Sequence, residues 1–217
     1  MLGARSLDRF GHAATSARGD GVQGVGKSTQ LRLLANACRA RGLTVVTTRE
    51  PGGTPGAEAI RAMVLDPSGE GWGPRAEALL FAAARADHVD RLIRPALERG
   101  DWVLTDRYLD SSRAYQGGGS GLDDAEILAL HQIGSNGLLP DRTVLLELAP
   151  ALAAQRLAAR DLGQSDRIGG RDTAYHARVA TAFRRFAQDD PARFALIDAD
   201  GTPDAVHARV LATVLDA

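Results

Sequence analysis

The sequence predicts an α/β fold in which a parallel sheet of about five strands is flanked by helices on both faces. Two observations lead to this fold class. Short runs of aliphatic and β-branched residues alternate along the chain with longer segments in which apolar residues recur every three or four positions. Several of the short runs, such as "TVLLEL", are apolar almost throughout, which is typical of strands buried on both faces.

The first half of the chain supplies two predicted helices and two predicted strands. A helix is expected over residues 27–41, with Gly42 as a typical stop, and the β-branched stretch "LTVVTT" at residues 43–48 is expected to form a strand. A short buried strand is expected over residues 101–106. A long helix is expected over residues 76–99, where apolar residues recur at helical spacing: Leu79, Leu80, Ala83, Ala86, Val89 and Ile93.

The second half repeats the alternation. Strands are expected over residues 142–148 and 194–199, and helices over residues 124–135, 150–161, 173–189 and 204–215. Glycine-rich loops are expected at residues 69–73 and 117–121. No repeat or long linker divides the chain, so we expect a single domain over residues 1–217, with a short, arginine-bearing lid region at residues 156–171.

The composition limits the classes of partner. The formal net charge is −1 at pH 7, so no basic field indicates binding to nucleic acid or to a membrane surface. No apolar run approaches the ~18 residues that a membrane-spanning helix needs. The single cysteine, Cys38, fits a reducing compartment, and we expect a cytoplasmic protein. Residues 1–18 lack an apolar targeting core and are interpreted as an atypical N-terminal segment.

A phosphate-binding loop is the strongest motif. Residues 21–28, "GVQGVGKS", match the pattern G-x-x-x-x-G-K-[ST], in which backbone N–H groups and the N-terminus of the following helix surround phosphate oxygens. Lys27 is expected to bridge the β- and γ-phosphates of a nucleotide, and Ser28 to bind Mg²⁺. The motif predicts a three-layer P-loop NTPase fold. The expected ATP-binding residues are Gly21, Val22, Gln23, Gly24, Val25, Gly26, Lys27, Ser28 and Thr29.

Asp106 is a second predicted metal ligand, and the residues before the P-loop differ from those that usually precede this motif. Asp106 ends the apolar strand "WVLTD", where its carboxylate could hold Mg²⁺ directly or through water. A P-loop usually follows a buried strand, but residues 13–18, "AATSAR", are small and polar and would make a poor central strand.

Five segments give the chain a resemblance to a known family. They are "REPGGTPGAEAIR", "EALLFAAARADHV", "IRPALERGDWVLTDRYLDSSRAYQGGG", "LLPDRTVLLEL" and "DRI", which together span most of residues 21–199. In this combination the chain resembles thymidylate kinases, P-loop kinases of nucleoside monophosphates. The resemblance implies transfer of a phosphoryl group from ATP to dTMP with Mg²⁺ as cofactor, and a homodimer.

The resemblance also assigns roles within the acceptor site. It makes Arg49 a clamp on the dTMP phosphate, and it implies a cis peptide bond at Pro51. Phe81 becomes the aromatic face on which thymine stacks, although an apolar helix would also place it in the core. Arg85, one helical turn later, is placed to reach a carbonyl of the base.

Further residues follow from the segment after Asp106. By resemblance Arg107 reaches the acceptor phosphate, and Tyr108 crowds the 2′ position of the sugar. Ser112 and Gln116 resemble polar contacts to the base and sugar, with Ser111 as an alternative to Ser112. Hydrogen bonds that cap a helix or pair with backbone groups of a loop would explain these polar side chains about as well.

The lid is expected to supply charge that the P-loop lacks. Val22, Gln23 and Val25 are not basic, and relatives with this pattern use lid arginines instead. The candidates are Arg156, Arg160 and Arg167, of which Arg160 and Arg167 are expected to be catalytic together with Lys27, Asp106 and Arg107. Two departures from the family are Gln23, where many relatives have an acidic residue, and Asp20, where relatives often have glutamate.

Two other functions stay open at this point. The first is a kinase for another nucleotide or a small metabolite, against which Phe81, Arg85 and Tyr108 argue. The second is a non-catalytic nucleotide-binding protein, which the unusual stretch before the P-loop supports and Asp106 argues against.

Overall fold

The computed structural model describes the backbone of residues 10–17 and the full residues 25–149, 152 and 166–214. Its elements in chain order are β1 (Phe10–Ala17), α1 (Lys27–Ala40), β2 (Val45–Arg49), α2 (Pro55–Leu65), α3 (Pro74–His88), the π-helix η1 (Val89–Ile93), α4 (Arg94–Glu98), β3 (Trp102–Asp106), α5 (Leu109–Ser112), the π-helix η2 (Arg113–Gly119), α6 (Asp124–Ser135), β4 (Arg142–Leu148), α8 (Thr173–Asp189), β5 (Phe194–Asp198) and α9 (Pro203–Val214).

The sheet contains five parallel strands in the order β2-β3-β1-β4-β5. Parallel strands need a crossover between them, and here the crossovers are helical. The α/β class and the parallel sheet that the sequence predicts are therefore both present. The stretch before the P-loop, expected from its residues to make a poor central strand, nevertheless forms part of β1, which lies at the centre and pairs with β3 and β4.

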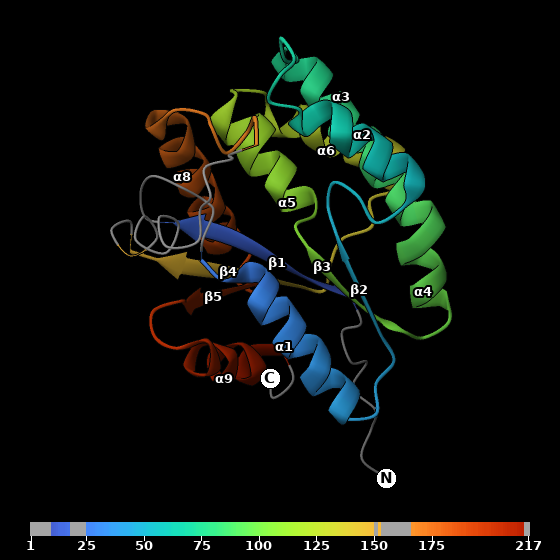
Figure 1. The fold of residues 1–217 in the computed structure, drawn as a ribbon, viewed down its shortest axis with the longest axis vertical. Helices are drawn as coiled ribbons and strands as arrows, with labels where there is room; N and C mark the ends of the chain where they lie inside the picture. Colours follow the sequence, from blue (N-terminus) through green and yellow to red (C-terminus); the bar gives the residue numbers. More distant parts are fainter. Residues whose placement is uncertain (1–9, 18–24, 150–151, 153–165, 215–217) are drawn as a thin grey trace.

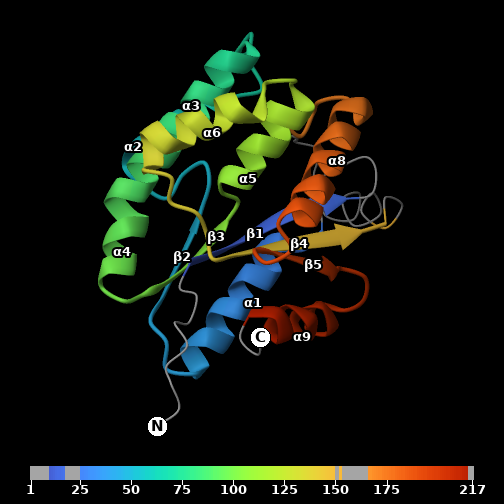
Figure 2. The ribbon, with the colours of Figure 1, turned by 180° about the vertical axis from the view of Figure 1, so that it is seen from behind.

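Helices cover both faces of the sheet. Helices α1 and α9 lie on one face, and the other described helices lie on the opposite face (Figures 1 and 2). Two layers of side chains fill the space between the sheet and these helices. The layer under α1 and α9 contains Leu34, Cys38, Val206 and Val210, and all four are buried.

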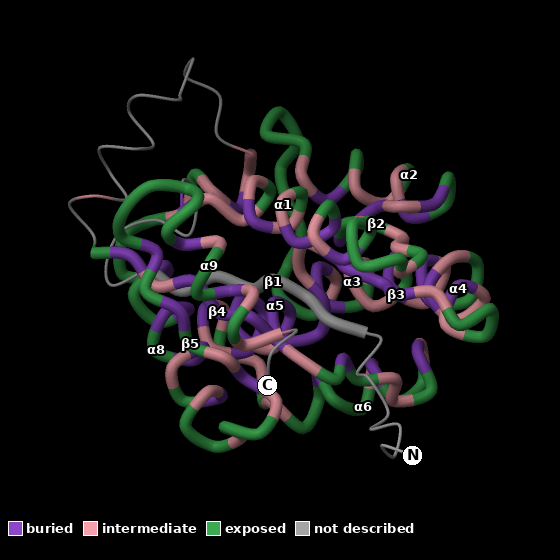
Figure 3. The backbone as a smooth tube through the Cα atoms, turned by 90° about the horizontal axis from the view of Figure 1, so that it is seen from below, coloured by how far each residue is buried: buried purple, intermediate pink, exposed green. Residues whose placement is uncertain are grey.

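Strands β3 and β4 contribute side chains to both layers. Along β4, Val144 and Leu146 pack in the layer under α1 and α9, whereas Leu145 packs on the opposite side against Phe183 of α8. Successive side chains of a strand point to opposite faces, so apolar residues at consecutive positions, as at Val144, Leu145 and Leu146, fit a strand covered on both sides. Figure 3 shows the resulting band of buried residues through the middle of the molecule.

Three predictions about elements are corrected. Helix α2 was not predicted, although Thr54 caps it by accepting a hydrogen bond from the Ala57 N–H (3.3 Å) and Pro55 opens it. The predicted helix over residues 76–99 is divided by η1, which ends two residues before Pro95. Proline has no N–H for the carbonyl four residues earlier, and a wider π turn accommodates that loss.

The third correction concerns the glycine-rich segment at residues 117–121, which was predicted as a loop. Its first three residues belong to η2. Gly119 lies against α8, and an added Cβ would stand 2.5 Å from a ring carbon of Tyr175. The glycines therefore permit close packing of two helices here. Most of the predicted helix over residues 150–161 lies outside the described residues.

Candidate active site

The carboxyl ends of β2 and β3 lie side by side at one edge of the sheet, and β1 runs alongside β3. In the strand register Asp106, the last residue of β3, is opposite Arg49 of β2 on one side and Ala13 of β1 on the other. Open α/β sheets bind their ligands outside this edge. The described end of the P-loop motif lies at the same edge, because Ser28 contacts Asp106.

The described part of the P-loop has the geometry of a helix N-terminus. Gly26 precedes α1 with φ +94°, a left-handed conformation that favours glycine, and Val25 beside it is buried. Lys27, Ser28 and Thr29 then form the first turn of α1. The predicted phosphate-binding residues Gly21, Val22, Gln23 and Gly24 lie outside the described residues.

The two predicted metal ligands lie next to each other. Ser28 Oγ is 3.4 Å from Asp106 Oδ2, and Asp106 Oδ1 is buried with no hydrogen-bond partner among the described residues. A hydroxyl and an unsatisfied carboxylate oxygen fit the oxygen preference of Mg²⁺. The described residues contain no cluster of three or more histidine, cysteine or acidic side chains, so phosphates and water would complete the coordination of a bound ion.

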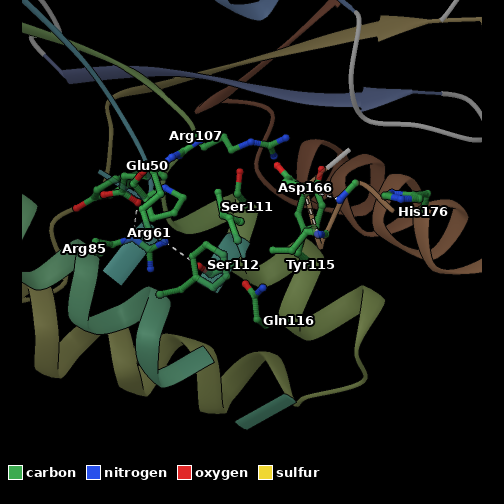
Figure 4. Close-up of a pocket in the computed structure, with 16 residues that line it drawn as sticks. Glu50, Arg61, Arg85, Arg107, Ser111, Ser112, Tyr115, Gln116, Asp166 and His176 are labelled. Carbon is green, nitrogen blue, oxygen red and sulfur yellow. Dashed lines mark hydrogen bonds and ion pairs between the residues drawn. The ribbon is translucent and has the colours of Figure 1, made fainter. Parts of the chain in front are cut away.

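A pocket opens beside this edge (Figure 4). One wall comes from α3, which contributes Phe81 and Arg85, and the other comes from α5 and η2, which contribute Ser112 and Gln116. Phe81 is partly buried against the core cluster of Tyr115 and Phe183 and still lines the pocket. The structure thus brings together four residues that the sequence analysis assigned to the base.

Arg85 is held by a buried network. Its Nε donates to Glu50 Oε2 (2.8 Å), and its Nη2 donates to Ser112 Oγ (2.7 Å). The other oxygen of Glu50 is 3.0 Å from His88 Nδ1, and His88 Nε2 is 2.7 Å from Thr48 Oγ1. Burial would raise the pKa of Glu50, but Arg85 and His88 outweigh burial and lower it. Glu50 and His88 were not assigned from the sequence.

Tyr108 forms part of the pocket floor. Its ring is fully buried and meets His131 edge to face, with ring centroids 5.7 Å apart. The guanidinium carbon of Arg85 lies 5.4 Å from the centre of the same ring. Burial raises the pKa of the Tyr108 hydroxyl, which therefore stays protonated at neutral pH.

The part of the pocket that Arg61 and Arg107 line is called the basic end here, and the acidic residue Asp166 also lies near both arginines. Arg107 follows Asp106 with φ +70°, an uncommon conformation for a residue other than glycine. This turn directs its side chain into the pocket, and its guanidinium carbon lies 5.0 Å from the centre of the Tyr115 ring. Arg61 of α2 also lines the pocket and donates to the Pro51 carbonyl (2.8 Å). Figure 4 shows Arg61 beside Glu50, whereas the Arg107 side chain extends toward Asp166 and Tyr115.

Arg49 takes a different place from the one expected. Its Nη2 donates to both oxygens of Glu58 (3.1 and 3.2 Å), and Arg49 is not among the described residues that line the pocket. Arg61 was quoted in the motif "REPGGTPGAEAIR" but received no role. Thr54 followed by Pro55 is a typical start of a helix and could have predicted α2. A helix that starts there places Arg61 near the carboxyl end of β2, where the pocket lies. The Glu50–Pro51 peptide bond is cis, as the resemblance implied.

The lid region is only partly described. Arg156 and Arg160 lie outside the described residues. Arg167 donates from Nε to the Asp66 carbonyl (2.9 Å) and from Nη2 to the Gly69 carbonyl, so in this conformation it holds the loop that follows α2. Asp166 lines the pocket and accepts from the N–H groups of the two residues after Arg167.

A family model and three known proteins match most of this chain. The sequence model described as "Thymidylate kinase" matches residues 20–210. The chain belongs to the thymidylate kinase family. A thymidylate kinase of Rhizorhabdus wittichii is 57% identical over 197 residues, covering 91% of this chain and 95% of the relative. Those of Bradyrhizobium diazoefficiens and Nitrobacter winogradskyi are 46% and 47% identical over 198 residues, covering 91% of this chain and 87% and 86% of the relatives.

The match to the thymidylate kinase family includes every described residue of the pocket and the described part of the P-loop. It begins at residue 20, after β1. The part of the chain that forms the central strand is thus outside the matched range. Among the described residues no helix is long and apolar enough to cross a membrane.

Proposed function

We propose that the protein transfers the γ-phosphoryl group of ATP to dTMP and so forms dTDP. Membership of the thymidylate kinase family supports this activity. The observation that carries it in the structure is the position of the pocket. A slot with one aromatic wall and a basic end opens beside the strand edge where Ser28 and Asp106 meet.

The two ends of the pocket suit the two ends of dTMP. Phe81 supplies an apolar face for the thymine ring, and Arg85, fixed by Glu50 and Ser112, supplies N–H donors for a base carbonyl. The basic end would take the phosphate. Arg107 and Arg61 both line it, and planar guanidinium groups bind phosphate oxygens in pairs.

Arg61 is the better candidate than Arg49 for the second phosphate contact. The charge of Arg49 is already matched by Glu58, and the side chain is 56% exposed. Burial and the neighbouring arginines 49 and 107 lower the pKa of Arg61, with burial the larger cause. Asp166 offsets part of the repulsion between Arg61 and Arg107, and a dianionic phosphate bound between the two guanidinium groups would offset more of it. Tyr108, beneath the sugar, remains the proposed barrier to a 2′-hydroxyl.

The proposed transfer needs little covalent chemistry from the protein. A phosphate oxygen of dTMP attacks the γ-phosphorus of ATP in line, the bond from that phosphorus to the bridging oxygen breaks, and ADP leaves with this oxygen. Lys27 and Arg107 neutralise charge on the transferred group. Mg²⁺, when bound by Ser28 and Asp106, would neutralise charge on the β- and γ-phosphates. We also propose that Arg160 and Arg167 contribute from the lid, for which Arg167 must leave the carbonyls of Asp66 and Gly69.

We further propose a cytoplasmic homodimer. Large apolar side chains are exposed on α2, α3 and α6, which lie side by side in both views (Figures 1 and 2). They include Ile133, which is 83% exposed, and Leu79, which is 56% exposed, together with Met63 and Leu128. A second copy of the chain would cover this face. Ile133→Asp should convert the dimer to a monomer in analytical ultracentrifugation; an unchanged sedimentation coefficient would place the interface elsewhere.

A substrate panel tests the activity. ADP release is measured with dTMP, dUMP, dCMP and AMP as acceptors for the wild type and for Lys27→Ala. We expect dTMP to give the highest kcat/KM. The Lys27→Ala variant should lose at least about 100-fold in kcat, because Lys27 is the one charged residue in the motif at residues 21–28. Preference for another acceptor would reassign the substrate. Near-normal turnover of the variant would remove the phosphate-binding role of Lys27.

A further inference from the structure

Gln116 lines the pocket with almost no exposed surface, and its amide has one donating end and one accepting end. Which end faces a bound base decides which base fits. The amide nitrogen Nε2 donates to Glu77 Oε1 at 2.9 Å. The accepting oxygen is therefore the end of the amide left for the pocket (Figure 4 shows Gln116 at its wall).

Glu77 is held in place as a hydrogen-bond acceptor. It is fully buried in the first turn of α3, and its second oxygen, Oε2, pairs with Arg171 Nη2 at 2.5 Å. Arg171 in turn donates to Ser120 Oγ (3.0 Å) and lies over the Tyr175 ring, 4.6 Å from its centre. An ion-paired carboxylate has no proton to donate, so it can only accept from Gln116. The carboxylate thus fixes the orientation of the amide.

The opposite wall of the slot has the complementary property. Arg85 can only donate, and Glu50 and Ser112 hold its Nε and Nη2. A base between the walls meets N–H donors from Arg85 and a carbonyl acceptor from Gln116. Thymine and uracil have an acceptor at O4 and a donor at N3–H, whereas cytosine has a donor at its 4-amino group and an acceptor at N3.

We propose that Glu77, supported by Arg171, is a positioning residue that selects thymine over cytosine by fixing the amide of Gln116 with its oxygen toward the base. This proposal rests on the proposed dTMP kinase activity and deepens it. Glu77 does not touch the base. It acts through Gln116, and the discrimination arises because cytosine would leave buried polar groups unpaired.

The substitution Glu77→Gln tests the orientation directly. Arg171 offers only donors, so it retains the oxygen of the new amide and turns the Nε2 group toward Gln116. The amide of Gln116 must then rotate to accept, and its N–H faces the pocket. We expect the ratio of kcat/KM for dTMP to that for dCMP to fall about 5- to 140-fold, which corresponds to 1–3 kcal/mol for mispaired buried groups.

A reciprocal exchange separates positioning from a structural role. In Glu77→Gln/Gln116→Glu, the new glutamine donates to the new carboxylate, whose second oxygen again presents an acceptor to the pocket. We expect the dTMP to dCMP ratio to return to within about threefold of the wild type. A ratio that stays at the value of the single variant would overturn the proposal. If the single variant does not fold, the double variant is compared with the wild type alone: a ratio within about threefold of the wild type supports the proposal, and a ratio at least about fivefold lower overturns it.

Asp110→Asn serves as a matched control. Asp110 is also a fully buried carboxylate, and Arg193 binds it through two hydrogen bonds (2.7 and 3.0 Å), but Asp110 does not line the pocket. The Asp110→Asn variant should have a lower midpoint of thermal unfolding, with an unchanged ratio of kcat/KM for dTMP to that for dCMP. A shift of the ratio as large as that of Glu77→Gln would overturn the proposal. A wild type that does not prefer dTMP would instead refute the proposed function, so the two failures are distinguishable.

Discussion

Substitution of Glu50 by glutamine should destabilise the protein far more than the same substitution at Glu58. Both glutamates pair with an arginine, but their surroundings differ. The side chains of Glu50 and Arg85 are each 4% exposed, whereas the Arg49–Glu58 pair is 56% and 41% exposed. Removing one member of a buried pair leaves an uncompensated charge in the interior, and exposed pairs are screened by water.

The magnitudes follow from these environments. Glu50→Gln leaves the Arg85 charge uncompensated and disturbs two hydrogen bonds, so we expect the free energy of unfolding to fall by about 3–5 kcal/mol. Glu58→Gln should cost about 0–1 kcal/mol. Urea unfolding followed by circular dichroism at pH 7 measures both values. A difference between the two variants of less than about 1 kcal/mol would refute the argument from burial.

The same network predicts how stability depends on pH. The pKa of Glu50 is lower in the folded protein than the ordinary value of 4.5, because Arg85 and His88 outweigh the effect of burial. A carboxyl with a lowered folded pKa stabilises the protein above its unfolded pKa and loses this contribution as pH falls through the folded pKa. The stability difference between the wild type and Glu50→Gln should therefore be full at pH 6–7 and shrink below pH ~4.5. A difference that grows toward acid pH would contradict the sign.

Three further predictions concern binding and transfer. Arg61→Ala should weaken dTMP binding, measured by calorimetry, about 10- to 100-fold without changing thymidine binding. Arg49→Ala should change neither affinity. If Arg49→Ala weakens dTMP binding and Arg61→Ala does not, Arg49 is the residue that contacts the phosphate. Phe81→Ala should weaken dTMP binding by about 1–3 kcal/mol and leave ATP binding unchanged, and a loss of thermal stability alone would make Phe81 a core residue. Arg160→Ala/Arg167→Ala should lower kcat far more than either single substitution, and a loss confined to ATP affinity would make the lid a binding element only.

The elements that the sequence predicted best are those with a strong local signal. The predicted limits of α6, β4 and α8 agree with the structure residue for residue. Helix α6 begins with a capping box between Asp123 and Glu126, and β4 is apolar at almost every position. In contrast, β1 has small and polar residues, and its central position follows from pairing with β3 and β4. Pairing with neighbours can override a weak local preference for a strand.

The sequence by itself determined the P-loop, the strand-end Asp106 and the family, because each depends on residue types at fixed short spacings. Only the tertiary structure decided the arrangement within the pocket. It paired Arg49 with Glu58 and brought Arg61 to the basic end, and it set Glu77 behind Gln116, 39 residues away. Contacts over such separations depend on how the helices pack across the sheet. The spacing of residues along the chain does not encode which end of a buried amide faces a ligand, since that orientation is set by the partner that folding brings beside it.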